Sequence, residues 1–244
     1  MKVDAIRLDL RPRPMFEAVD LGVRLVSAHL RTLWTSCAPV YVFVLLVAGA
    51  ALAFGTGWGL LTLIWLKPWL DRSILFVLAR AVFGEATTFA DVWAARGAVF
   101  RDGLLGALTM RRLSPWRSYV QPVLQLEGQR GKARRDRVHR ILGPHRGAAV
   151  AMQIAFAAFE SALALGLASL IPWFSPADER GTWLVALFGF GSPWTLGIEL
   201  ACFALAVAIV EPFFVGAGFA MYLNRRVELE AWDIEQEFRL AFAR

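Results

Sequence analysis

Long apolar blocks constrain this chain more than any other feature. Residues 37–54 carry no charged side chain, and residues 148–171 and 194–223 carry only isolated carboxylates. A bilayer core about 30 Å thick is crossed by about 20 helical residues, so each block is long enough to span it. A helix satisfies its own backbone hydrogen bonds in lipid. The sequence therefore predicts an all-α fold, a polytopic transmembrane helical bundle.

The breaks between the blocks predict about four spans, arranged as two helical hairpins plus interfacial helices. The least certain span is residues 58–70, because Lys67 and Pro68 interrupt it. We expect Lys67 to extend to the membrane surface; a re-entrant segment, or a helix continuing through 74–83 with a kink at Pro68, are alternatives. The expected segments of this single membrane domain (1–244) are an amphipathic interfacial helix (14–33), span 1 (34–54), span 2 (58–70), a basic cytoplasmic segment (84–146), span 3 (148–171), an interfacial or re-entrant helix (182–190), span 4 (194–223) and a cytoplasmic tail helix (224–244).

The distribution of Lys and Arg predicts the orientation. Six lie in residues 1–33, fourteen in 72–146 and four in 224–244, whereas the expected outer segments hold only Arg180. Because cytoplasmic loops collect Lys and Arg, both termini are expected in the cytoplasm. We expect no cleavable signal peptide, because the first apolar run begins only near Trp34.

Three carboxylates inside the apolar blocks form the candidate intramembrane polar site: Glu160, Glu199 and Glu211. A charge at mid-membrane costs roughly 2.5 kcal/mol or more, so each needs a partner or a function. One hypothesis is a proton or cation path, or a site for a lipid headgroup. The other is that these acids hydrogen-bond between helices, with Glu211 bonding carbonyls that Pro212 frees.

A basic run marks the middle of the cytoplasmic segment. Three interpretations stay open: attraction to anionic lipid headgroups, a solvated positive loop, or an acidic protein partner. Nucleic acid is not expected, because no base-stacking module accompanies the charge. The run consists of Arg130, Lys132, Arg134, Arg135, Arg137 and Arg140.

No catalytic, cofactor-binding or metal-binding motif accompanies these features. His139 and His145 are six residues apart around a Gly-Pro break, and no cysteine or acidic cluster joins them, which is not metal-ligand spacing. Cys37 and Cys202 lie in apolar blocks and are expected to be reduced. We therefore expect a protein that is not an enzyme and needs no cofactor.

Small residues and turn signals predict local packing. Gly216-Ala-Gly218 indicates a close helix contact. The same is expected of a small-residue face formed by Ala158, Ala162 and Gly166. Thr88 followed by Asp91 is typical of a helix start.

The end of the last block carries the most distinctive sequence. Its motifs are Glu211-Pro-Phe-Phe-Val, Ala220-Met-Tyr-Leu-Asn-Arg-Arg and Glu228-Leu-Glu-Ala-Trp-Asp-Ile-Glu235. They resemble a family of uncharacterised bacterial inner-membrane proteins and, more distantly, the membrane domain of glycerophosphoryl diester phosphodiesterases. The resemblance implies a bacterial inner-membrane location and no reaction, because phosphodiesterase chemistry belongs to a separate soluble domain. The matching residues are expected to form a membrane-boundary clamp between tail and loop: Asn224, Arg225, Arg226, Glu230, Trp232, Asp233 and Glu235.

Three functional hypotheses follow. The first is a non-enzymatic accessory or scaffold component of an envelope-associated complex, with a protein partner or as a homo-oligomer. The second is a small transporter or lipid-handling protein using Glu160 in a site between helices. The third, with Arg111, Arg112 and Arg117 near a headgroup, is a lipid-modifying enzyme, and no catalytic pair supports it.

Overall fold

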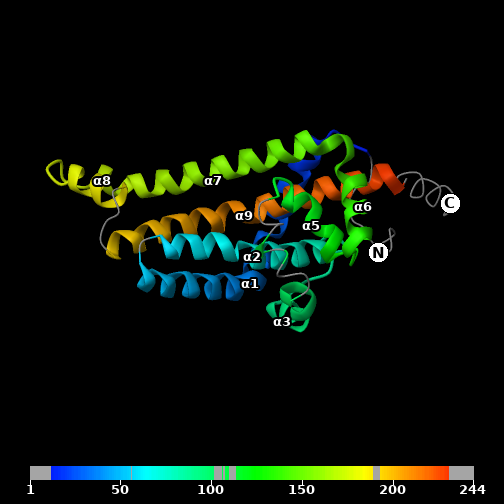
Figure 1. Cartoon of the computed structure of the whole chain (residues 1–244), viewed down its shortest axis with the longest axis horizontal. Helices are drawn as coiled ribbons and strands as arrows, with labels where there is room; N and C mark the ends of the chain where they lie inside the picture. Colours follow the sequence, from blue (N-terminus) through cyan, green and yellow to red (C-terminus); the bar gives the residue numbers. More distant parts are fainter. Residues whose placement is uncertain are drawn as a thin grey trace.

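Helix is the only regular secondary structure in the part of the chain that the computed structural model describes, which comprises residues 12–55, 57–101, 106, 108–109, 114–188 and 193–230. Four long helices run along the longest axis of the molecule, and the shorter ones gather near the two ends (Figure 1). In chain order the elements are α1 (Met15–Ala51), η2 (Leu52–Phe54), α2 (Trp58–Ala81), α3 (Phe89–Ala94), the π-helical turn η3 (Gly97–Arg101), α5 (Arg117–Gln125), α6 (Gly131–Leu142), η4 (Gly143–His145), α7 (Arg146–Phe174), α8 (Arg180–Phe188) and α9 (Pro193–Glu230).

Three of these helical stretches are long and apolar enough to cross a membrane: Met15–Phe54, Gly131–Phe174 and Trp194–Glu230. They contain the predicted spans 1, 3 and 4. The expected interfacial helix and span 1 form the single helix α1, and α9 continues past residue 223 to Glu230 without a break.

Helix α2 differs from the prediction in length and composition. The helix is 24 residues long, and it continues through Pro68 and past residue 70 to Ala81. Lys67, Asp71 and Arg72 lower its apolar content, and all three are buried. The expectation that Lys67 extends to the membrane surface is therefore wrong, because its side chain is only 7% exposed.

Helices α1 and α9 cross in close contact. A Cβ added at Gly22 would lie 2.4 Å from the backbone oxygen of Gly216, and one at Gly218 would lie 2.3 Å from the Ser118 hydroxyl oxygen. The close contact predicted at Gly216-Ala-Gly218 is confirmed, and it involves two neighbouring helices. α1 packs against one of these glycines and α5 against the other, so larger residues would separate the helices.

The small-residue face of α7 does not pack within the chain. Ala158, Ala162 and Gly166 are exposed, and a Cβ added at Gly166 would meet no atom within 4 Å. The prediction of a close helix contact there is wrong for the single chain. α7 contacts α9 through its opposite face, where Phe156 packs edge-on against Phe214.

The described part of the predicted basic segment folds against one end of the bundle, the end that holds residue 12 and residue 230 (Figure 1). The expected helix start at Thr88 is confirmed as a capping box with Asp91. α5 is buried between other elements and packs on α9, and α6 runs across this end of the bundle. At the opposite end Phe54, Trp58 and Trp194 are exposed, as in an aromatic belt.

Candidate functional site

Two charged residues that each precede a proline meet inside the bundle. Lys67 comes directly before Pro68 in α2, and Glu211 directly before Pro212 in α9. The Lys67 Nζ lies 2.5 Å from Glu211 Oε2. Proline has no backbone N–H and opens the preceding helical turn. The two helices therefore present polar side chains at points where their own hydrogen bonding is interrupted.

Glu160 in α7 joins the same lysine. Lys67 Nζ donates to both oxygens of the Glu160 carboxylate, at 2.8 and 2.7 Å. Glu160 is 12% exposed and Glu211 is 1% exposed. One ammonium group thus connects α2, α7 and α9 in a region from which water is nearly excluded.

Arg117 extends the network into α5. Its guanidinium donates to Glu211 at 2.9 Å and lies 3.4 Å from the Asp71 carboxylate. The guanidinium also lies over the Phe214 ring, 4.9 Å from its centroid. The buried network, as we name it, therefore consists of Lys67, Asp71, Arg117, Glu160 and Glu211, and it ties four helices together.

The charges of the buried network do not balance. It holds two cations, Lys67 and Arg117, and three carboxylates. Burying one uncompensated charge costs several kcal/mol, and a proton or another cation removes that cost. Among these five described residues, the arrangement can therefore accept one positive charge in addition to Lys67 and Arg117.

Sequence reasoning identified part of this site. Glu160 and Glu211 are brought together, whereas Glu199 lies elsewhere on α9 and is half-buried. Glu211 bonds Lys67 and Arg117, and no contact with a carbonyl freed by Pro212 is among those the structure describes for it. Lys67, Asp71 and Arg117 were missed as members; the matched Lys-Pro and Glu-Pro pairs were the available signal.

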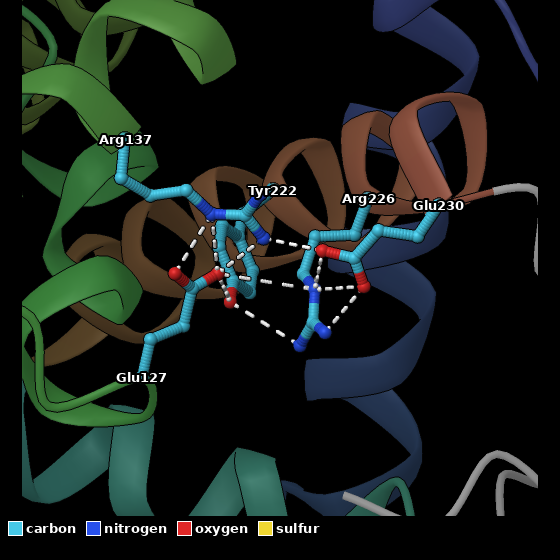
Figure 2. A network of polar contacts seen from close by, with 5 residues as sticks. All are labelled: Glu127, Arg137, Tyr222, Arg226 and Glu230. Atoms are coloured by element: carbon cyan, nitrogen blue, oxygen red, sulfur yellow. Dashed lines mark hydrogen bonds and ion pairs between the residues drawn. The ribbon is translucent and has the colours of Figure 1, made fainter.

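A second group of charges lies near the end of the bundle where the described chain begins and finishes (Figure 2). Arg137 of α6 donates to both oxygens of Glu127, at 2.8 and 3.1 Å, and also to Glu230. Arg226 pairs with Glu230, and the Tyr222 hydroxyl donates to Glu127 at 2.7 Å. We name this group the boundary network. It joins the end of α9 to α6 and to the turn after α5.

The described residues of the expected membrane-boundary clamp take part in this and in a neighbouring set of contacts. The Asn224 side chain and the Arg13 backbone exchange two hydrogen bonds, of 2.9 and 2.8 Å. Arg225 pairs with Glu228 and also donates to the carbonyl of Arg140. Trp232, Asp233 and Glu235 lie outside the described residues.

The cations of the basic run lie on different sides of α6 and differ in exposure. Arg134 and Arg137 turn toward the protein and are half-buried, whereas Arg130, Lys132, Arg135 and Arg140 are exposed. Arg111 and Arg112 lie outside the described residues, and Arg117 belongs to the buried network. Among the described residues, no group of three or more His, Cys, Asp or Glu is placed to hold a metal ion.

Fold and site together define a helical protein with three helices long and apolar enough to cross a membrane and a charge network buried between its helices. No family model, no curated protein and no solved structure matches the chain. The resemblance to uncharacterised inner-membrane proteins therefore stays a prediction.

Proposed function

We propose that the chain is a small multi-pass transporter of the bacterial inner membrane that moves a proton or a small cation through the buried network. The observation that carries the proposal is the excess of one carboxylate among five linked, buried charges. Ion pairs in a protein interior are often no more stabilising than apolar residues of similar size. Ionisable groups within membrane spans commonly mark ion paths and proton relays.

The sign of the excess charge selects the ligand. An anionic lipid headgroup would add negative charge to a site that already has one carboxylate too many. A proton or a small cation neutralises it. Glu160 is the group we assign to exchange this charge, because it is the most exposed of the carboxylates in the network, at 12%.

We propose four spans, with both termini in the cytoplasm. In addition to the three helices named above, α2 crosses the membrane as span 2. A 24-residue helix rises about 36 Å, and its Lys67 and Asp71 are paired within the bundle. The asymmetry of Lys and Arg supports this orientation. A reporter fused at Ala177 is expected to be periplasmic and one at Lys132 cytoplasmic; the opposite pair of results would reverse the topology.

Ion flux tests the transport proposal directly. The full-length chain is reconstituted in liposomes, a proton, sodium or potassium gradient is imposed, and flux is followed with an ion-sensitive dye. Glu160→Gln is expected to reduce flux at least tenfold. Glu199→Gln is the matched control, because Glu199 lies in an apolar helix outside the network, and it is expected to retain wild-type flux. Wild-type flux equal to that of empty liposomes, or no effect of Glu160→Gln, would overturn the proposal.

A second candidate is a non-enzymatic accessory or scaffold component of an envelope-associated complex. The observation that favours it is the rigid inner end of the bundle, where the boundary network ties α9 to α6. α9 continues into this end without a break, as far as Glu230. Co-purification in mild detergent tests the role by comparing the full chain with one ending at Glu230. Identical partners in both preparations exclude docking through the tail, and the absence of any stoichiometric partner excludes the scaffold role.

A further inference from the structure

One face of α6 carries cations that the fold leaves on the surface. On a helix with 3.6 residues per turn, Lys132, Arg135 and His139 share one side, with Arg140 at its edge. All four are exposed. The opposite side of the helix holds Ile141, which is buried in the core. The exposed orientation is therefore set by packing of the apolar side.

The end of α6 is fixed against the bundle. The Tyr119 hydroxyl donates to the Ile141 carbonyl at 2.9 Å, and burial raises the pKa of this hydroxyl above its ordinary value, so it stays a donor at neutral pH. The guanidinium of Arg137, on a different side of α6, is held by Glu127 and Glu230. The exposed face is consequently presented by a rigid helix.

Helix α7 begins one turn beyond α6 and extends the basic face toward the apolar surface. Its first residue, Arg146, is exposed and lies with an Nη atom 3.2 Å from the His139 Nδ1. Above Arg146, the outward side of α7 is apolar: Ile154 is 62% exposed and Phe159 is 59% exposed. Ile154 is eight residues from Arg146, which is about 12 Å along the helix. This distance matches the step from a headgroup layer to the acyl chains beneath it.

We propose that Lys132, Arg135, Arg140 and Arg146 bind the phosphate headgroup of an anionic phospholipid, whose acyl chains lie along the exposed apolar side of α7. Charge complementarity supports this occupant, because Asp136 is the only carboxylate among the described side chains on this face of α6. The apolar side supports a lipid over an acidic polypeptide, because most of the apolar stretch of α7 faces outward. Only 11% of that stretch is buried within the chain, against 61% of the apolar stretch of α9. The proposal does not depend on the transport function.

Lipid retention tests the site. The full chain is purified in mild detergent and titrated with phosphatidylglycerol or with phosphatidylcholine, and bound lipid is counted by native mass spectrometry. Each cation near a membrane surface contributes about a fivefold gain in affinity for anionic lipid. The quadruple variant K132Q/R135Q/R140Q/R146Q is therefore expected to lose about 600-fold in affinity for phosphatidylglycerol, and to bind phosphatidylcholine as the wild type does.

A matched control separates the site from general charge. R24Q/R31Q/R96Q/R101Q removes four exposed arginines elsewhere and is expected to keep wild-type affinity within about threefold. The melting temperature without added lipid shows whether each variant is folded. Equal loss in both variants, or equal binding of the two lipids by the wild type, overturns the proposal. A lipid-insensitive dimer lost on Ala158→Trp would assign the α7 face to a second copy of the chain and also overturn it.

Discussion

The buried network and the boundary network use similar residues in opposite ways. The boundary network balances two arginines against two glutamates, whose side chains are 11% to 25% exposed. The buried network sets two cations against three carboxylates, with side chains only 1% to 13% exposed. The network with better access to water is neutral, and the one without it is not. Charge balance, rather than the number of ion pairs, therefore separates the two networks, and the proposed ion site is the one with an excess carboxylate.

Access to water also decides what each network loses when one partner is removed. A partly exposed charge that loses its partner is solvated, so exposed pairs contribute about 1 kcal/mol or less. A buried charge that loses its partner has no such replacement, and the cost is about 3–5 kcal/mol. The predictions below test this difference, beginning with the largest effect.

Lys67→Met is expected to destabilise the protein most, by about 3–5 kcal/mol. The substitution leaves the Glu160 and Glu211 carboxylates without the ammonium that they share. Unfolding is measured by denaturant titration of the purified chain in mild detergent. The control is Lys132→Met on the exposed face of α6, which is expected to change stability by about 0.5 kcal/mol or less.

The double variant Lys67→Met with Glu160→Gln sharpens this result. It removes one charge of each sign and is expected to recover part of the lost stability, because fewer carboxylates stay unpaired. If the single and double variants were equally unstable, Lys67 would act through its packing and not through its charge.

The glycine crossing lies on α9 between the two networks. Gly22→Ala is expected to destabilise by about 1–3 kcal/mol, the usual cost of overpacking, since the added Cβ would meet the Gly216 backbone. Gly166→Ala, where nothing lies within 4 Å, is the matched control and is expected to be neutral or slightly stabilising. Equal effects of the two substitutions would show that α1 and α9 do not need their close approach.

The sequence predicts features that depend on neighbouring residues better than features that depend on residues far apart in the chain. Apolar block length is a local property, and it predicted the three membrane-length helices. Helix continuity through Pro68 was only one of the alternatives, because neighbouring helices stabilise that turn and a proline alone does not show this. Glu160 pairs with Lys67, which also pairs with Glu211, and no local pattern relates residues so distant in sequence.

The Lys67 error has a physical lesson. A lysine near the end of an apolar block ordinarily extends its ammonium toward the headgroups. Here two carboxylates from other helices offset the cost of burying that ammonium. Counting charges of both signs within the apolar blocks, including those next to prolines, would have suggested the pair before the structure did.

Arg137→Met probes the boundary network and is expected to cost about 1–2 kcal/mol. The substitution removes two hydrogen-bonded partners at once, which raises the cost above that of a single exposed pair. The loss should shrink as salt is raised, because ions screen charges that water can reach. Denaturant titrations at low and high salt measure it. The effect of Lys67→Met should change little with salt, and the reverse pattern would contradict the contrast between the networks.

The smallest effect is expected at a carboxylate that belongs to neither network. Hydrogen bonds from the Thr88 backbone N–H and hydroxyl, each 2.8 Å long, hold the pKa of Asp91 below its ordinary value. A lowered folded-state pKa means that Asp91 stabilises the start of α3 at neutral pH and loses that contribution as the pH falls through the folded-state pKa. Asp91→Asn should therefore reduce hydrogen-exchange protection of the α3 amides at neutral pH, and the difference from wild type should vanish in acid. Asp136→Asn, an exposed carboxylate within α6, should leave the protection of α6 unchanged. A difference at Asp91 that persisted at low pH would assign its effect to side-chain shape instead of charge.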